Sequence, residues 1–405
     1  MKISVRLLLF FLAVAALPLM LFSYLNLRQD EETLRTEAFG RMSDLADKKA
    51  VQVRSYLAER VQDVRLLARG PRVMTAMAVL PGEYLPARRA GAAYAAEDAN
   101  THQYFERYVE ETGLFYDVFF ISVQGEIVYT QKHETDFGSN LLTGSLRDSK
   151  FAQAFRAVRM TMEPVISGYE IYEPSHAPAL FIAAPVIVGG KLKGVFAVQL
   201  GNELLYRVAN DATGLGITGE VTFAQHDGDG VLYTTPMKYR ADAAMKYRVQ
   251  GAELKSLPTS SATSGNSGAG SGPDYRGIPV IAAWRYLPEL EWGMVVKVDV
   301  DEVLEPIARQ RMLLIEALAV CLLLAALTAY YLGRRISRPI RALAQVADQV
   351  SAGRLDSRAD ENAPGELGVF AAAFNRMTVN LQELYRTLED RIDERTRELN
   401  ATNEQ

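Results

Sequence analysis

The stretch IAAPVIVGGKLKGVFAVQLGNELL, residues 182–205, recurs as IAAWRYLPELEWGMVVKVDVDEVL at residues 281–304. The two stretches align without a gap, and each has the composition of two strands joined by a turn. A further hairpin pattern precedes each copy, YDVFFISVQGEIVYT at 116–130 and EVTFAQHDGDGVLYTTP at 220–236. The repeat therefore predicts an α+β fold with two tandem antiparallel-sheet modules, each with one face that helices and loops can cover.

Two apolar segments, residues 7–27 and 312–333, are long enough to cross a bilayer, which takes about 20 residues. Lys2 and Arg6 precede the first segment, and Arg334 and Arg335 follow the second. Because basic residues mark the cytoplasmic side, we expect both termini inside and the modules outside the membrane of a multi-pass protein. A cleaved signal peptide is the alternative for the first segment, but its apolar run is longer than such signals carry.

Residues 28–71 carry apolar side chains at helical spacing and contain no proline before Pro71, so they predict one long helix. The net charge of −5 gives no reason to expect a nucleic-acid partner. The single cysteine, Cys321, excludes an intramolecular disulfide. The four histidines are far apart in sequence, and we expect no metal site and no cofactor.

The segment after the second apolar stretch has two heptad seams, which are typical of helices that pack along one another. The first seam is Ile336, Ile340, Leu343, Ala347 and Val350, and the second is Leu367, Phe370, Phe374, Met377, Leu381, Leu384 and Leu388. Pro339 suits a first helical turn, Gly353 a helix end, and Glu366 a helix start. Two such helices bury their seams well in a four-helix bundle, so a homodimer is predicted.

The order of anchor, long helix and two sheets resembles the double Cache sensor domain of bacterial receptors over roughly residues 30–308. RRISRPIRALAQVADQVSAGRLDSR and GELGVFAAAFNRMTVNLQEL resemble a HAMP domain. The resemblance implies a membrane-distal module at 72–210, a membrane-proximal module at 211–308 and a HAMP domain at 334–387. Residues 388–405 would be a signalling coiled-coil helix. A Ser-, Gly- and Thr-rich stretch at 256–274 predicts a flexible surface loop.

In the double Cache family the ligand usually lies in the distal module. The resemblance therefore implies a small-molecule site formed by Tyr129, Tyr169, Tyr172, Ser175, Phe181 and Gln199. Ordinary core packing is the alternative for each of these residues. Gln199 stands where members that bind amino acids carry an aspartate, so we expect a neutral or anionic ligand rather than an α-amino acid.

The two resemblances imply a transmembrane receptor of the bacterial inner membrane that passes a ligand signal to a cytoplasmic output domain or response regulator. No histidine follows residue 311 and no glycine-rich nucleotide loop is present, so we expect no catalytic residue within this chain. A histidine kinase beyond Gln405 is the favoured output. A chemoreceptor-type sensor is one alternative, a binding protein without output another, and a periplasmic protein could replace the small ligand as the signal.

Overall fold

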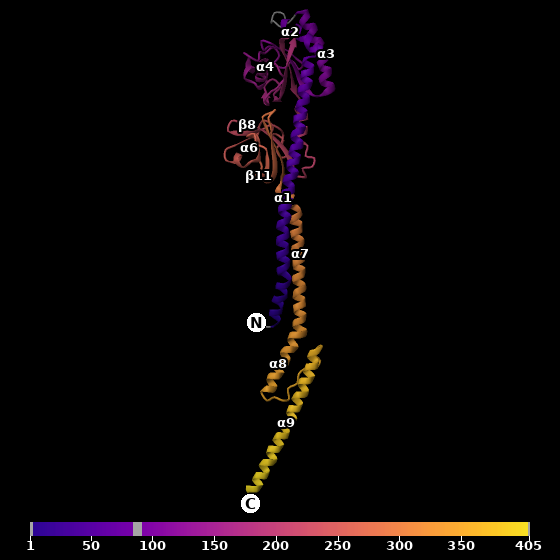
Figure 1. Ribbon diagram of the computed structural model, residues 1–405, viewed down its shortest axis with the longest axis vertical. Helices are drawn as coiled ribbons and strands as arrows, with labels where there is room; N and C mark the ends of the chain where they lie inside the picture. Colours follow the sequence, from indigo (N-terminus) through magenta and orange to yellow (C-terminus); the bar gives the residue numbers. More distant parts are fainter. Residues whose placement is uncertain (1–2, 84–90, 404–405) are drawn as a thin grey trace. The chain divides into compact units, whose positions relative to one another are not determined.

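The computed structural model describes residues 3–83 and 91–403 and divides the chain into two units. One unit comprises residues 31–305, and the other comprises residues 1–30 and 306–405. Figure 1 shows the mixed α/β part and the helical part. The predicted combination of a long N-terminal helix with antiparallel sheets is confirmed.

The unit at 31–305 contains two antiparallel sheets with the same core strand order. The first sheet has the order β2-β1-β7-β6-β3 and the second has the order β10-β9-β8-β13-β12-β11. The strands of the first sheet are β1 (Phe115–Ser122), β2 (Ile127–Thr130), β3 (Val165–Ile166), β6 (Phe181–Val188) and β7 (Lys191–Leu200). Those of the second are β8 (Glu220–Asp227), β9 (Gly230–Tyr233), β10 (Arg248–Gln250), β11 (Gly268–Pro273), β12 (Pro279–Leu287) and β13 (Trp292–Asp299).

Helices and a small hairpin complete this unit. The helices are the part of α1 (Ile3–Ala68) from residue 31 on, α2 (Pro71–Glu83), α3 (Ala92–Thr112), α4 (Lys150–Thr161), α5 (Asn202–Asn210) and α6 (Pro258–Thr263). Short 3-10 turns lie at Ser145–Asp148 and Glu253–Ser256. The strands β4 (Glu170–Tyr172) and β5 (Ala177–Ala179) pair only with each other.

The gapless alignment of the two repeats is correct along their first strands and wrong along their second strands. Ile182 corresponds to Ile281, and these residues pair with Val198 and Val298. Ile182 and Ile281 are 99 residues apart in sequence, whereas their partners Val198 and Val298 are 100 residues apart. The register has therefore shifted by one residue. A one-residue shift moves every side chain to the other face of a strand.

Different turns explain the shift. The first hairpin turns through Gly189 and Gly190 and has a register irregularity between Val186 and Ile187, whereas the second turns through residues 288–291. The structural counterpart of Gln199 is therefore Asp299 rather than Val298.

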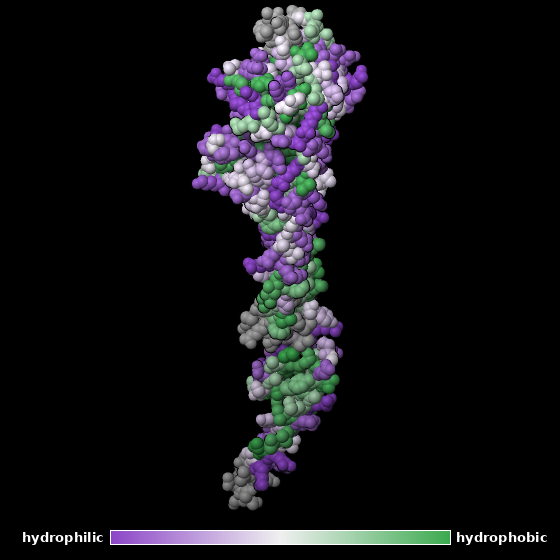
Figure 2. Space-filling model, turned by 45° about the horizontal axis from the view of Figure 1, so that its top comes forward, coloured by the Kyte–Doolittle hydropathy of each residue, from purple (hydrophilic) through white to green (hydrophobic). Residues whose placement is uncertain are grey.

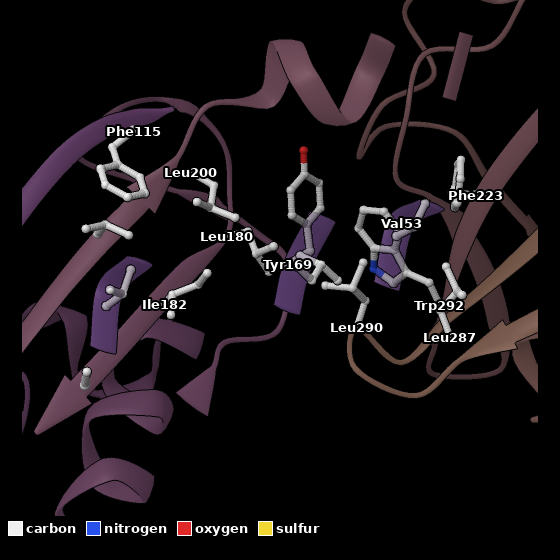
Figure 3. Close-up of a cluster of buried hydrophobic side chains, with 14 of the residues drawn as sticks. Val53, Phe115, Tyr169, Leu180, Ile182, Leu200, Phe223, Leu287, Leu290 and Trp292 are labelled. Atoms are coloured by element: carbon white, nitrogen blue, oxygen red, sulfur yellow. The ribbon is translucent and has the colours of Figure 1, made fainter. Parts of the chain in front are cut away.

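One face of α1 packs in a core that both sheets share. The buried α1 residues of this core are Ala38, Met42, Ala46, Ala50, Val53, Leu57, Val64 and Ala68. They recur at the spacing of one helix face. The same core includes Phe196 of the first sheet and Trp292 of the second, and Figure 3 shows part of it. Burial of a valine or leucine side chain contributes about 1.5–3 kcal/mol, so this face holds the unit together.

The stretch at 256–274 is not a flexible loop, and that prediction is wrong. It forms α6 and edge strand β11, and Thr259 and Ala262 are buried. A Cβ at Gly293 would lie 2.6 Å from the Cβ of Ala262, so only glycine lets α6 lie directly on β13. Small side chains therefore serve close packing here rather than flexibility.

The helical unit contains most of α7 (Val300–Leu332), a π-helical turn at Gly333–Ser337, α8 (Arg338–Ser351) and α9 (Glu366–Asn403). Among the described residues, the helical run Val300–Ser351 contains a stretch of mean hydropathy 2.5. This stretch is long and apolar enough to cross a membrane. Figure 2 shows hydrophobic surface exposed on this unit. The other predicted span, 7–27, lies within α1, where Leu17 and Phe22 are exposed, and it stays a prediction.

Leu57→Ala should lower the free energy of unfolding by about 2–5 kcal/mol, because Leu57 is 1% exposed in the shared core. Val51→Ala is the matched control on the same helix, since Val51 is 59% exposed, and should change it by less than about 0.5 kcal/mol. Chemical unfolding of the detergent-solubilised chain, followed by tryptophan fluorescence, measures both. Equal losses would contradict the assigned face of α1.

Candidate functional site

Three strands of the first sheet bring side chains together at one end of one face. Asp117 on β1 pairs with Gln199 on β7, and Gln199 pairs with Phe181 on β6. Residues directly opposite one another in antiparallel strands point to the same face. This face carries a core cluster that includes Phe119 and, from α4, Phe151. Asp117, Gln199 and Phe181 therefore lie side by side beneath α4 and the β4–β5 hairpin.

The β4–β5 hairpin and the segment after β2 complete the arrangement. The Tyr172 ring lies 4.8 Å from the Phe181 ring, centroid to centroid. The Tyr172 hydroxyl donates to Asp136 Oδ2 at 2.8 Å, and Gln199 Nε2 donates to Ser175 Oγ at 3.4 Å. Four of the six predicted ligand residues thus contact one another, together with Asp117 and Asp136, which the sequence reading did not include.

Asp117, Asp136 and Gln199 form what we call the acceptor cluster, because each has a buried oxygen without a partner. Asp117 Oδ1 accepts three backbone N–H groups, from Val118 at 2.7 Å, Gln131 at 2.8 Å and Lys132 at 3.0 Å. Among the described residues, Asp117 Oδ2, Asp136 Oδ1 and Gln199 Oε1 have no hydrogen-bond partner. Such groups are rare in folded proteins because each costs about 1–3 kcal/mol, so the acceptor cluster is a candidate for a binding site.

Burial disfavours the charged form of the Asp117 and Asp136 carboxyl groups. Burial raises the pKa of Asp117 to about 7, although backbone N–H groups oppose the rise. Burial also raises the pKa of Asp136 to about 6, and the hydrogen bond from Tyr172 limits this rise. Within the described ranges, no group of three or more His, Cys, Asp or Glu side chains is placed to hold a metal ion.

The structure places Tyr129 and Tyr169 outside the acceptor cluster. Tyr129 pairs with Phe120, whose side chain packs in the α1 core on the opposite face of the first sheet. Tyr169 donates its hydroxyl to Asn202 Oδ1 at 2.8 Å. Its ring meets Trp292 edge-on at 5.1 Å between centroids, as Figure 3 shows. Tyr169 therefore links the first sheet to the second rather than lining the cluster.

The corresponding face of the second sheet differs because its carboxylates are paired. Asp299, the counterpart of Gln199, accepts from Arg276 at 2.5 Å. The buried Lys297 ammonium lies 2.8 Å from Glu220 Oε2 and 2.5 Å from Asp274 Oδ2. This face is internally neutralised to a large extent, and α6 covers it at Gly293.

The two heptad seams face each other within the helical unit. Ile340 and Leu343 of α8 and Phe370 and Phe374 of α9 line a groove of about 400 Å³. Val350, Met377 and Leu381 line a second groove of about 770 Å³. Pro339 and Glu366, the predicted helix-start residues, lie in the first turns of α8 and α9. Gly353, the predicted helix end, follows α8 with a φ of 88°.

One residue of this region was missed by the sequence reading. Asn375 is buried on α9 and ties the connector between the helices to it. Its Oδ1 accepts the Ala359 N–H at 2.8 Å, and its Nδ2 donates to the Ala359 carbonyl at 2.8 Å and to Glu361 at 2.7 Å. A polar residue beside an apolar seam is the signal that could have indicated this role.

Comparisons with known proteins agree with this architecture. A family model described as Cache domain matches residues 31–307, and one described as HAMP domain matches residues 331–383. The nitrate/nitrite sensor protein NarQ of Escherichia coli (strain K12) is 32% identical over 102 residues, which are 24% of this chain and 18% of NarQ.

Two solved structures illustrate the similarity. The sensor domain of the Vibrio cholerae histidine kinase DctB is 14% identical, with 67% of this chain and 98% of that chain covered and a TM-score of 0.45. The ligand-binding domain of the Pseudomonas fluorescens chemoreceptor CtaA, in complex with L-isoleucine, is 15% identical, with 68% and 98% covered and a TM-score of 0.44.

Tyr172→Phe should destabilise the chain by about 1–3 kcal/mol at pH 8, because it leaves the buried Asp136 carboxylate without its donor. The lost hydrogen bond favours the charged form, so its removal raises the pKa of Asp136 further. The destabilisation should therefore grow as the pH rises through about 6 and be smaller at pH 5. Thermal unfolding at both pH values measures it.

Tyr116→Phe is the control for this prediction, because the Tyr116 hydroxyl donates to Glu134 at the exposed surface. It should change the stability by less than about 0.5 kcal/mol. A Tyr172→Phe effect that does not depend on pH would contradict the assigned contact with Asp136.

Proposed function

Because the chain belongs to the Cache domain family and carries a HAMP domain, it is built as a transmembrane signal transducer, and we propose that it senses a small extracytoplasmic ligand at the acceptor cluster. The observation that supports this site is the set of buried, unpartnered oxygens on Asp117, Asp136 and Gln199. A ligand that donates hydrogen bonds would satisfy all three at once.

We further propose that residues 72–210 and 211–308 are tandem modules and that only the first binds the ligand. Their sheets share a core strand order, as expected for a duplicated unit. The first module has open acceptors, whereas in the second the Arg276 and Lys297 side chains neutralise the carboxylates. The second module thus carries built-in charged partners in the region where the first would hold its ligand.

The chemistry of the cluster favours a ligand with N–H or O–H donors and an apolar part. Two carboxyl groups would repel an anion, so the anionic ligand expected from Gln199 alone is less favourable than a neutral or cationic one. Tyr172 and Phe181 supply aromatic surface for the apolar part. An amine or amide donor therefore suits this site best.

The link to the membrane is direct in sequence. Strand β13 ends at Asp299 and α7 begins at Val300. Glu302, in the first turn of α7, accepts the backbone N–H groups of Ile217 and Thr218 at 2.7 Å each. A shift of the second sheet would therefore displace α7. Bistable packing of helices is a common way to amplify such a shift.

We propose spans at 7–27 and 312–333 with both termini cytoplasmic, and a homodimer through the HAMP domain at 334–387. The exposed apolar seam supports the dimer, since Phe370 is 59% and Met377 is 56% exposed. Residues 388–405 would continue as a signalling helix toward a histidine kinase output, with a chemoreceptor-type output as the alternative. The chain spans 18% of the length of NarQ, so the output rests on inference.

A thermal-shift screen of the full chain against amines, amides, amino acids, sugars and organic acids tests the ligand site. A compound at 100 times its Kd should stabilise the chain by about 2.7 kcal/mol. Gln199→Ala and Tyr172→Ala should abolish the shift, whereas Ile217→Ala, an exposed position in the linker, should keep it. A shift that survives both site variants would place the ligand elsewhere.

Cysteine cross-linking tests the HAMP homodimer. In a Cys321→Ser background, Met377→Cys should form a disulfide between two copies, because a seam position meets its counterpart in a parallel bundle. Arg376→Cys, one residue away and exposed, should cross-link much less. Equal cross-linking of both variants in membranes, read on non-reducing gels, would contradict the proposed seam.

A further inference from the structure

The side chains of Asp117 and Gln199 each present a hydrogen-bond acceptor that lacks a donor among the described residues. The two residues lie directly opposite each other on β1 and β7 and are almost fully buried. Asp117 Oδ2 and Gln199 Oε1 both accept hydrogen bonds, and neither has a donor among the described residues. Two buried acceptors that share one place in a sheet can be satisfied together by a single added hydrogen.

We propose that in the ligand-free receptor Asp117 carries a proton on Oδ2 and donates it to Gln199 Oε1, so that a proton holds the place of the ligand. This inference rests on the proposed ligand site and specifies its regulation. Protonation converts the carboxylate from an acceptor into a donor. It leaves Oδ1 free to keep its three backbone N–H groups.

The charged groups around Asp117 favour the protonated form. From the segment after β2, Asp136 repels a charge on Asp117, while Gln131 and Lys132 offer only backbone N–H groups to it. The Lys132 ammonium lies instead over the Tyr116 ring, 5.5 Å from its centroid. On the strand itself, Tyr116 donates to Glu134.

Among the described residues, the cations of the covering helix α4 are engaged elsewhere: Lys150 acts on Glu170, Arg156 donates to the Arg147 carbonyl, and Arg159 lies over the Phe155 ring. From β4, Tyr172 donates to Asp136, and from β7 the neutral Gln199 faces Asp117. The burial that raises the pKa of Asp117 to about 7 acts in the same direction as this arrangement. Solvent supplies the proton when the site is empty.

Ligand binding would then release this proton. A ligand N–H or O–H that donates to Asp117 Oδ2 replaces the carboxyl hydrogen, which leaves for solvent as the O–H bond breaks and the carboxylate forms. A cationic donor gains the most, because it then pairs with a buried carboxylate. Acidification outside the cell should therefore weaken binding by competition, and alkalinisation should strengthen it.

Infrared difference spectroscopy of the full chain in lipid nanodiscs tests the protonated pair with the proton itself as the probe. Between pH 5 and pH 9 the wild-type chain should lose a carboxylic-acid C=O band with a midpoint near the pKa of about 7, in addition to the band that Asp136 loses near pH 6. Asp117→Asn should lack the band with the midpoint near the pKa of about 7. Asp148→Asn should keep it, because the Asp148 side chain is 87% exposed. Identical titrations of the wild-type chain and Asp117→Asn would overturn the proposal.

Gln199→Asp keeps the test decisive if Asp117→Asn does not fold. Two carboxylates in opposite positions share one proton, so the midpoint should move to higher pH by about one unit or more. An unchanged midpoint would overturn the proposal. The titration needs no ligand. If no band titrates but a compound still binds, only the proposed protonation of Asp117 is overturned. If the band titrates but no compound binds, the protonation is supported and the proposed ligand site is not.

Discussion

The fold depends on the burial of one face of α1 against both sheets. An antiparallel sheet needs a cover for its apolar face, and here a single helix provides it twice. Ion pairs reinforce the contact. The Arg285 guanidinium binds both Asp47 carboxylate oxygens, at 2.6 and 2.9 Å, and the buried Lys49 pairs with Asp211. Because the two sheets share one core, we expect a displacement of one sheet to alter the packing of the other. The edge-on contact of Tyr169 with Trp292 lies where they meet.

The two sheets resolve the same physical problem in different ways. Polar groups on a buried sheet face must find partners or destabilise the fold. The second sheet satisfies its carboxylates with Lys297 and Arg276. On the first sheet three oxygens have no partner among the described residues, which supports the proposed ligand site. Duplication followed by this divergence would separate a sensing module from a transmitting one, with Glu302 fastening the latter to the start of α7.

The sequence predicted the long helix, the paired hairpins and the positions of α8 and α9, because each has a strong periodic pattern. It failed where tertiary packing overrides local composition. The Gly- and Ser-rich stretch at 256–274 became α6, which lies directly on β13 through small side chains, and β11, which pairs with β12. The buried position of Asp117 was hidden because a single carboxylate near the start of an apolar strand resembles a surface residue. Its alternation with Phe119 was the available signal.

Register was the second obstacle. A bulge after Val186 and a longer second turn cannot be counted from a gapless alignment, yet they decide which residue corresponds to Gln199. Strand pairing also decides the position of Tyr129. It pairs with Phe120 and not with Phe119, so its side chain lies on the face of the sheet opposite to the acceptor cluster. A cluster of aromatic residues in sequence is therefore weaker evidence for a site than strand pairing.

Hydrogen exchange of the full chain, with and without a compound that stabilises it, tests the central claim that the first module binds and the second transmits. We expect added protection in β4 and β5, together with a change in β13 and in the first turn of α7. Protection confined to the first sheet would contradict transmission through the second. Protection centred on the second sheet alone would contradict the assignment of the ligand to the acceptor cluster.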